Sequence, residues 1–275
     1  MTRREALRRL SAGALLAGGA WPGALRAADN GRGGEFRFLV VNDTHCMSPE
    51  CRQWLDRAVS QMRTEQAAFC LLAGDLTEHG EEDNLAAVRD VFGRLGVPLY
   101  VQIGNHDYAA PADRSAYERI FPGRINYAFH HAGWQFLGLD TTEGRRYEQT
   151  TIADATLRWL DDQLPRLDRE QPTVIFTHFP LGAGVTYRPR NADALLERFL
   201  PFNLQAVFSG HFHGFTERTF KSAAVTTNRC CALKRGNHDG SREKGYFVCT
   251  AAEGRVTRRF VELSTALDQP SRPNE

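Results

Sequence analysis

The sequence has almost no net charge, and this limits what the protein can bind. Its 275 residues include 34 Lys and Arg and 33 Asp and Glu, which gives a formal charge of +1 at pH 7. Loss of residues 1–27 would remove five basic residues and one acidic residue and leave a charge of about −3. Without a basic stripe, attraction to nucleic acid or to anionic lipid is weak. We therefore expect no binding of duplex nucleic acid.

The sequence also lacks an apolar run long enough to cross a bilayer. The apolar stretch Leu10–Trp21 is too short to span one, and it follows the pair Arg3-Arg4. This order is typical of an export signal, and the paired arginines resemble a twin-arginine signal, although Ala6 stands where Phe is commoner. We expect residues 1–28 to be an export signal peptide read by the export machinery. The predicted location is the bacterial periplasm, with a permanent membrane anchor as the less favoured alternative.

Six cysteines are an even number, which permits disulfides in an exported chain without fixing their pairing. Cys70 and Cys249 lie in apolar runs and are expected to be buried thiols. The other four lie in polar, loop-like sequence: Cys46, Cys51, Cys230 and Cys231.

The composition, 42% hydrophobic and 24% charged, allows a full core without disulfides. We predict one domain over residues 35–263 and a disordered polar tail over residues 264–275. The first half of the domain is expected to consist of strand–helix units. Apolar runs at residues 36–41, 67–73 and 97–103 are the predicted strands, and Ser48-Pro49 caps the first predicted helix.

The second half is expected to begin with a hairpin over residues 127–139 and to end in a β-rich part. Predicted helices lie near residues 157–164 and 195–199, and predicted strands at 173–176, 205–208, 245–250 and 256–262. The fold class is therefore α/β.

Polar clusters follow five of the predicted strands. They are Asp43-Thr44-His45, Gly74-Asp75, Gly104-Asn105-His106-Asp107, Thr177-His178 and Gly210-His211-Phe212-His213. In open α/β sheets, ligands bind beyond the carboxyl ends of the strands, so these side chains are expected to converge, with Gly104 allowing a sharp turn. Carboxylate, imidazole and amide oxygen suit zinc, manganese or iron. The alternative is that each is an ordinary turn or a buried group with its own unrelated partner.

The ordered set of motifs resembles the calcineurin-like metallophosphoesterases, with the likeness running from about Phe36 to Glu262. The resemblance implies a four-layer αββα sandwich of two mixed β-sheets flanked by helices, and a binuclear metal site. It implies that Asp43, His45 and His213 hold one metal, that Asn105, His178 and His211 hold the other, and that Asp75 bridges both. His106 would be the catalytic group beside the metals.

Within that family, the pattern looks more like class III cyclic-nucleotide phosphodiesterases than purple acid phosphatases. Those phosphatases have a Tyr three positions after the residue matching Asp75 and Gly where this chain has His45. Glu78 stands where related protein phosphatases place an Asp that orients the catalytic His. The resemblance implies in-line attack by a metal-bridged hydroxide, with His106 protonating or stabilising the leaving oxygen.

We therefore predict a metal-dependent phosphoric ester hydrolase that acts on a small-molecule phosphoester, with a phosphodiesterase favoured. The alternatives are a phosphomonoesterase on the same site and a non-catalytic metal-binding module of this fold. The cofactors would be two divalent or transition metal ions, with manganese, iron and zinc all open.

A second Gly-Asn-His-Asp, at residues 236–239, follows the last of these motifs and has no metal position left to fill. We predict that it belongs to a loop that folds back over the site as a substrate-side lid. Asn237 and His238 would bind a phosphate or sugar, and Arg235 would offer a positive fork for phosphate. The alternative is a solvated hairpin turn.

Overall fold

The apolar side chains of the central strands point alternately to the two faces of each sheet, so both faces must be covered. In the computed structural model, which describes residues 34–263, β1 (Phe36–Val41) points Phe38 and Val40 to one face and Leu39 and Val41 to the other. All four side chains are buried. A strand that is buried on both faces needs a layer on each side.

The first sheet has the strand order β11-β10-β1-β2-β3. Its strands besides β1 are β2 (Phe69–Ala73), β3 (Leu99–Gln102), β10 (Gly245–Ala252) and β11 (Arg255–Glu262). β1, β2 and β3 run parallel, whereas β10 and β11 are antiparallel to their neighbours. The first sheet is therefore mixed.

The second sheet has the strand order β4-β5-β6-β7-β9-β8 and is also mixed. Its strands are β4 (Tyr127–His131), β5 (Trp134–Gly138), β6 (Thr173–Phe176), β7 (Leu204–Ser209), β8 (Thr216–Phe220) and β9 (Ala223–Thr227). β5, β6, β7 and β9 run parallel, and β4 and β8 pair antiparallel at the two edges.

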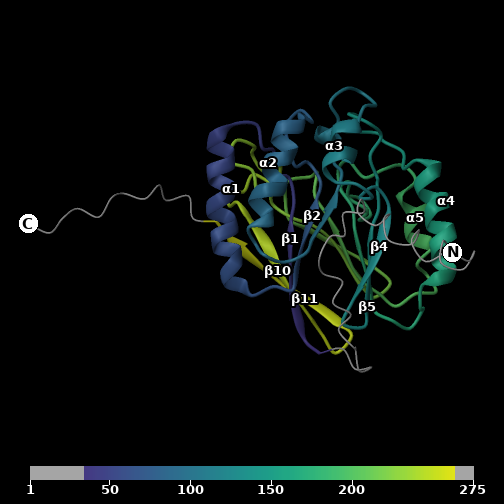
Figure 1. Cartoon of the computed structure of the whole chain (residues 1–275). Coiled ribbons are helices and arrows are strands. Elements are labelled where there is room, and N and C mark those ends of the chain that lie inside the picture. Colours follow the sequence, from purple (N-terminus) through teal and green to yellow (C-terminus); the bar gives the residue numbers. More distant parts are fainter. Residues whose placement is uncertain (1–33, 264–275) are drawn as a thin grey trace, which may run out of the picture. The chain divides into compact units, whose positions relative to one another are not determined.

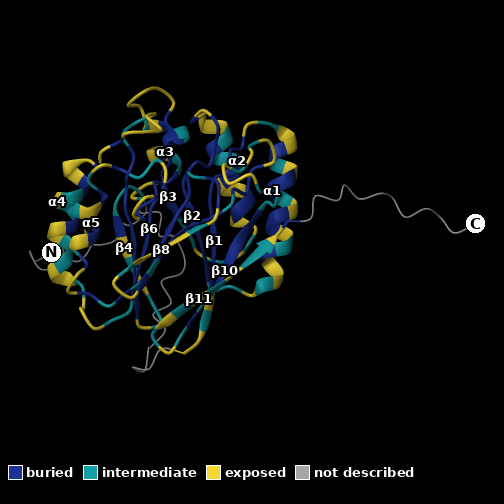
Figure 2. Ribbon diagram, turned by 180° about the vertical axis from the view of Figure 1, so that it is seen from behind, coloured by how far each residue is buried: buried dark blue, intermediate teal, exposed yellow. Residues whose placement is uncertain are grey.

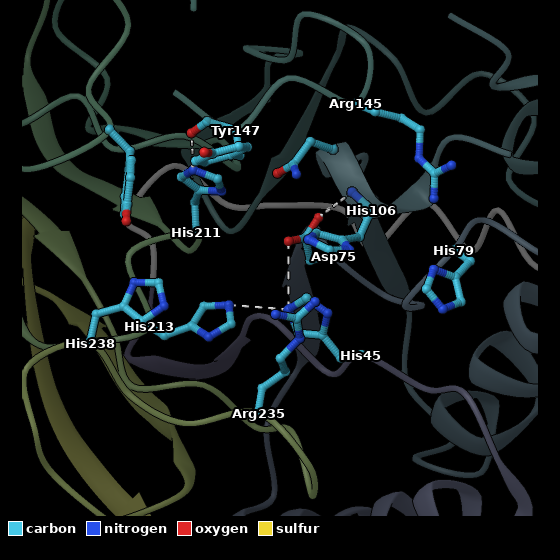
Figure 3. A pocket seen from close by; sticks show the side chains of 12 residues that line it. His45, Asp75, His79, His106, Arg145, Tyr147, His211, His213, Arg235 and His238 are labelled. Atoms are coloured by element: carbon cyan, nitrogen blue, oxygen red, sulfur yellow. Dashed lines mark hydrogen bonds and ion pairs between the residues drawn. The ribbon is translucent and has the colours of Figure 1, made fainter. Parts of the chain in front are cut away.

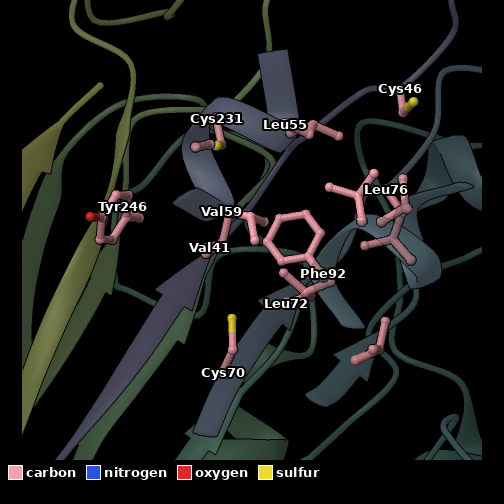
Figure 4. Close-up of a cluster of buried hydrophobic side chains, with 14 of the residues drawn as sticks. Val41, Cys46, Leu55, Val59, Cys70, Leu72, Leu76, Phe92, Cys231 and Tyr246 are labelled. Carbon is pink, nitrogen blue, oxygen red and sulfur yellow. The ribbon is translucent and has the colours of Figure 1, made fainter. Parts of the chain in front are cut away.

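Helices cover the outer face of each sheet (Figure 1). The first sheet carries α1 (Pro49–Met62), α2 (Glu82–Gly93) and α3 (Ser115–Ile120), and the second carries α4 (Asp154–Gln163) and α5 (Ala192–Glu197). Ser48 caps α1 as predicted, because its side chain accepts a hydrogen bond from the Cys51 backbone N–H at 3.4 Å. Figure 4 shows Val59 of α1 beside Val41 of the sheet, in the buried cluster that also contains Leu55 and Leu72.

The two sheets meet face to face through an aromatic layer. Phe38 and Phe69 of the first sheet stack at 5.3 Å, and both contact Phe136 of the second sheet edge-on. Full burial of each such ring stabilises the fold by about 1.5–3 kcal/mol. Figure 2 shows the central strands buried inside, and exposed residues on the helices, the loops and the edge strands β8 and β11. The predicted four-layer αββα sandwich is confirmed.

Three short elements were missing from the sequence-based expectations: β8, β9 and α3. The edge strand β8 was not predicted, because Glu217, Arg218 and Thr219 are exposed and give no apolar alternation. Its partner β9 and the short helix α3 were not predicted either. The sequence left disulfide pairing open, and all six cysteines are buried free thiols, as expected for Cys70 and Cys249.

Within residues 34–263, no helix is long and apolar enough to cross a membrane. The predicted export signal and C-terminal tail lie outside the described residues.

Candidate metal centre

The segments that follow the parallel strands are held against one another by backbone hydrogen bonds. The Asp43 N–H donates to the Gly74 carbonyl at 3.0 Å, and the Gly210 N–H donates to the His178 carbonyl at 3.0 Å. These bonds align the clusters within each sheet, because parallel strands end at the same edge. The two sheets are joined at one centre by the His211 N–H, which donates to Asp43 Oδ2 at 3.0 Å.

Five residues of this centre have left-handed backbone conformations, with φ between 43° and 64°. They are Asp43, His45, Asp75, His211 and His213. Non-glycine residues rarely adopt this region, and such strain gathers at functional sites where the surroundings enforce it. The turns that aim the side chains inward are therefore made by the predicted ligands themselves.

Gly104 is required for space and not for the sharp turn that the sequence indicated. Its φ is −111°, which any residue can adopt, but a Cβ there would lie 2.1 Å from the Asp75 backbone nitrogen. A Cβ on Gly74 would lie 2.5 Å from His178 Nδ1, and Gly74 also has φ +82°. Both glycines let neighbouring segments approach the centre closely.

One group of donors gathers around His213. Its Nε2 lies 3.3 Å from Asp43 Oδ1 and 3.1 Å from His45 Nε2. His45 Nε2 is in turn 3.6 Å from Asp75 Oδ2. Figure 3 shows His45, Asp75 and His213 pointing toward one another. Asp43, His45, Asp75 and His213 each offer one ligand atom, and these four atoms lie within 4.8 Å of one another. This is the spacing expected around one metal ion.

A second group gathers around His178. Its Nε2 lies 3.2 Å from Asp75 Oδ1, 3.1 Å from Asn105 Oδ1 and 3.2 Å from His211 Nδ1. Asp75 thus offers one carboxylate oxygen to each group. These two groups have the membership that the family resemblance assigns to two metals with Asp75 between them.

Each of the four histidines of the two donor groups has a second ring nitrogen that faces away from the donors and contacts another protein group. His178 Nδ1 donates to the Ala73 carbonyl at 3.0 Å, His211 Nε2 to the Tyr147 carbonyl at 2.7 Å, and His213 Nδ1 to the Gly236 carbonyl at 3.1 Å. A carbonyl only accepts, so each of these nitrogens carries a proton and the opposite nitrogen is free to bind a metal. For His45, the Glu78 carboxylate takes this place, with Oε2 3.0 Å from Nδ1.

The buried carboxylates of Asp43 and Asp75 need positive charge nearby. Burial alone would raise the pKa of the Asp43 and Asp75 carboxyls, but the imidazole of His213 lowers the pKa of Asp43 and that of His178 lowers the pKa of Asp75. Conversely, burial would lower the pKa of these two imidazoles, yet the carboxylates raise the pKa of His178 to about 9 and that of His213 to about 11. Protonated imidazoles thus neutralise buried carboxylates that two metal ions would otherwise neutralise. The donor set fits a binuclear metal centre.

His106 lies beside both donor groups without joining either. Its backbone N–H donates to Asp75 Oδ1 at 2.8 Å, and its ring centroid is 4.8 Å from that of His45. The Glu78 backbone carbonyl is 2.8 Å from His106 Nδ1, whereas the nearest Glu78 carboxylate oxygen is 3.6 Å away. Glu78 therefore holds the His106 ring chiefly through its backbone, which differs from the side-chain role that the sequence predicted.

The second Gly-Asn-His-Asp segment packs on the centre, but its residues divide in their roles. His238 and Arg235 line the cavity above the donors. Asn237 does not, because its amide donates to the Glu243 carbonyl at 2.8 Å and accepts from the Cys230 N–H at 3.0 Å. The structure thus places Asn237 as a loop support and not as the substrate ligand that the sequence predicted.

The cavity above the centre has a volume of about 380 Å³. Besides the predicted residues, it is lined by four that sequence reasoning did not assign to the site: His79, Arg145, Tyr147 and Tyr187. They lie in loops without periodicity, and their only sequence signal is a position after a strand that ends at this edge.

The sequence of residues 36–215 matches the family model of the calcineurin-like phosphoesterases. A probable cyclic nucleotide phosphodiesterase of Rhodopseudomonas palustris is 30% identical over 203 residues, which are 64% of this chain and 71% of that protein. The glycerophosphodiester phosphodiesterase GpdQ of Enterobacter lignolyticus is 26% identical over 189 residues, 62% of this chain and 65% of that protein. The chain thus spans about two thirds of the length of each of these relatives.

Among solved structures, a dimetal phosphatase from Danio rerio superimposes with a TM-score of 0.66. The superposition covers 82% of this chain and 95% of that chain at 17% sequence identity. At this identity, the likeness establishes the fold alone.

Proposed function

We propose that this chain, which belongs to the calcineurin-like phosphoesterase family, hydrolyses a small-molecule phosphodiester with the aid of two metal ions. One observation carries the proposal: the two oxygens of Asp75 face two separate donor groups, each completed by imidazoles. A carboxylate shared in this way is what two neighbouring metal ions require.

Asp43, His45 and His213 would hold one ion, and Asn105, His178 and His211 the other. When bound, the two ions supply Lewis acidity toward the phosphoryl group and lower the pKa of water. The carbonyls of Ala73, Tyr147 and Gly236 fix the imidazole orientations before any ion binds, so the protein provides a preorganised site.

His106 would protonate or stabilise the leaving oxygen. Its Nδ1 is held by the Glu78 carbonyl, which directs Nε2 away from that contact, and the His106 side chain lines the cavity. Arg145 and His79 line the same cavity, and the Arg145 guanidinium favours an anionic phosphoryl group at this position.

Support for a diester substrate comes from the relatives named above, which are described as phosphodiesterases. The test compares kcat/KM for bis(p-nitrophenyl) phosphate and p-nitrophenyl phosphate after reconstitution with manganese, zinc or iron. We expect the diester to be the better substrate with at least one metal. A preference for the monoester would instead support a phosphomonoesterase, and metal binding without turnover of either ester would support a non-catalytic module.

We also infer that the protein is exported to the periplasm by the twin-arginine route. The inference is supported by Arg3-Arg4 before the apolar stretch Leu10–Trp21. Fractionation of cells that express the full chain tests it, with the double substitution Arg3→Lys and Arg4→Lys as the comparison. We expect the parent chain in the periplasm and the variant in the cytoplasm, and equal distributions would contradict the inference.

A further inference from the structure

The cavity above the donor groups is bordered on one side by aromatic rings from three separate loops. These rings belong to Tyr147, Tyr187 and His238, which together we call the aromatic wall. The Tyr187 ring centroid lies 5.1 Å from that of His211, 5.9 Å from that of His238 and 6.3 Å from that of Tyr147. Tyr187 therefore stands at the middle of the wall.

Tyr187 also has a left-handed backbone, with φ +66°. This conformation is a genuine outlier for a bulky side chain, and its strain must be offset by surrounding contacts. A glycine or an asparagine would adopt the same backbone at lower cost, so the fold maintains a tyrosine ring at a position that disfavours one.

The other two residues are tied to the metal centre while their side chains line the cavity. The Tyr147 carbonyl accepts the hydrogen bond from His211 Nε2 at 2.7 Å, while the Tyr147 side chain makes the residue 56% exposed. The His238 ring stacks on that of His213, with centroids 5.1 Å apart and planes inclined by 22°. The wall is thus tied to the metal centre and lines the cavity.

The opposite side of the cavity is basic. Figure 3 shows Arg145 and His79 away from His211, His213 and His238, with His106 and Asp75 between them. Within the described range 34–263, neither the Arg145 nor the His79 side chain has a hydrogen-bond or ion-pair partner. A substrate phosphoryl group over Asp75 would therefore have His106 and the basic side chains on one flank and the aromatic wall on the other.

We propose that the aromatic wall is a subsite for a planar aromatic group on the retained alcohol of the phosphodiester, as in a nucleoside ester. The proposal rests on the proposed function, because the His106 side defines the leaving group. Stacking of a base on an aromatic side chain is sequence-tolerant, since every base has a π-face. The wall would therefore favour nucleoside esters as a class and would select no particular base.

The test uses three diesters with the same p-nitrophenol leaving group and different retained groups: ethyl, phenyl and thymidine attached through its 5′ oxygen. We expect kcat/KM for the thymidine ester to exceed that for the ethyl ester at least about tenfold. Tyr187→Asn tolerates the left-handed backbone and removes the ring, and it should lower this ratio at least about fivefold. Tyr187→Phe keeps the ring and should preserve the ratio.

Tyr147→Ala is the second variant, because it removes the ring and keeps the backbone carbonyl that holds His211. It should also lower the thymidine-to-ethyl ratio. The matched control is Phe215→Leu, which removes another exposed aromatic ring, 41% exposed and outside the cavity lining. It should leave both activities unchanged.

An equal gain for the phenyl and thymidine esters would support the planar subsite and identify any aryl group as its ligand. Ratios that stay the same in Tyr187→Asn and Tyr147→Ala would overturn the proposal while leaving the proposed function intact. Failure to hydrolyse any of the three esters would count against the proposed function. In that case, calorimetry of thymidine 5′-monophosphate binding to the metal-loaded protein tests the aromatic subsite. The proposal requires Tyr187→Asn and Tyr147→Ala to bind this nucleotide more weakly than the parent protein does, and equal binding would overturn it.

Discussion

The guanidinium of Arg235 pairs with both carboxylate oxygens of Glu78, 157 positions earlier in the sequence. The Nε–Oε2 distance is 3.0 Å, and Nη2 lies against Oε1. Burial alone would raise the pKa of Glu78, but the contacts from His45 and Arg235 lower it to about 2. The fork that the sequence predicted for a substrate phosphate is therefore occupied by Glu78, which in turn lies 3.0 Å from His45 Nδ1.

This relationship predicts that Glu78→Gln weakens metal binding. The carboxylate beside His45 Nδ1 orients that ring and raises its basicity, and loss of such a partner costs about 10–100-fold in metal affinity. Arg235→Gln should have a smaller effect in the same direction, because it leaves the carboxylate in place. Competition with a chelator measures both.

Glu82→Gln is the control for this prediction, since Glu82 pairs with Arg119 on the surface away from the cavity. It should leave metal affinity unchanged. Unaltered metal affinity in Arg235→Gln together with a raised KM would show that Arg235 binds substrate, as the sequence indicated.

Asp75→Asn should abolish activity and lower the metal content by half or more. The substitution removes the charge that the two donor groups share, and both ions depend on it for neutralisation. Elemental analysis gives the metal content per chain. Asp162→Asn, at an exposed position of α4, is the matched control. Full activity in Asp75→Asn would contradict the assignment of the centre.

His106→Ala should keep both ions and lose about 10²–10⁴ in rate, as expected for a general acid that binds no metal. The loss should be smaller for nitrophenyl esters than for alkyl esters, because a good leaving group needs less protonation. Parallel measurements of metal content and of kcat/KM for both ester types test this. Equal losses for the two types would mean that His106 acts as a ligand or as a structural residue.

The convergence of the donor groups could be predicted because it depends on topology. Asp43, Asp75 and Asn105 follow successive parallel strands, and His178 and His211 follow two parallel strands of the other sheet. Side chains placed after such strands share an edge, whatever the details of each turn. Apolar runs and order along the chain were sufficient for this step.

The walls of the cavity could not be predicted in the same way, because they depend on loop conformations fixed by tertiary contacts. Tyr147 is held by a hydrogen bond between its carbonyl and a histidine 64 positions away, and Tyr187 by a strained backbone. Neither leaves a periodic signal. Gly104 is a similar case, since its necessity arises from the approach of Asp75 from a different strand.

The pKa shifts in the centre predict that metal uptake releases protons. The carboxylates raise the pKa of His178 to about 9 and of His213 to about 11 against the opposing effect of burial, so both imidazoles carry a proton at neutral pH in the metal-free protein. An ion must displace these protons, and metal affinity should therefore rise with pH and fall as the solution is acidified.

Calorimetric titration with the metal in buffers of different ionisation enthalpy measures the number of protons released. We expect between one and about two protons per protein at pH 7. A metal affinity that is constant between about pH 6 and 8 would contradict the prediction, because unprotonated imidazoles would then face the ions at the outset.

Asn237→Ala should lower stability without changing substrate specificity. The Asn237 amide donates to the Glu243 and Ser241 carbonyls and accepts from the Cys230 N–H, so its loss leaves loop groups without partners. Each such group, where buried, costs about 1–3 kcal/mol. For a domain of this size, this corresponds to a fall in Tm of roughly 2–10 °C, which thermal denaturation measures.

His238→Ala provides the contrast, because His238 is an exposed residue of the same loop whose ring lines the cavity. It should raise KM for aromatic diesters with little change in Tm, since its ring stacks on His213 from the solvent side and supports no loop backbone through its side chain. If Asn237→Ala instead kept the parent Tm and raised KM, this would mean that the Asn237 amide of the parent protein leaves its loop partners to bind substrate. The lid role first read from the sequence would then apply to Asn237 as well as to His238.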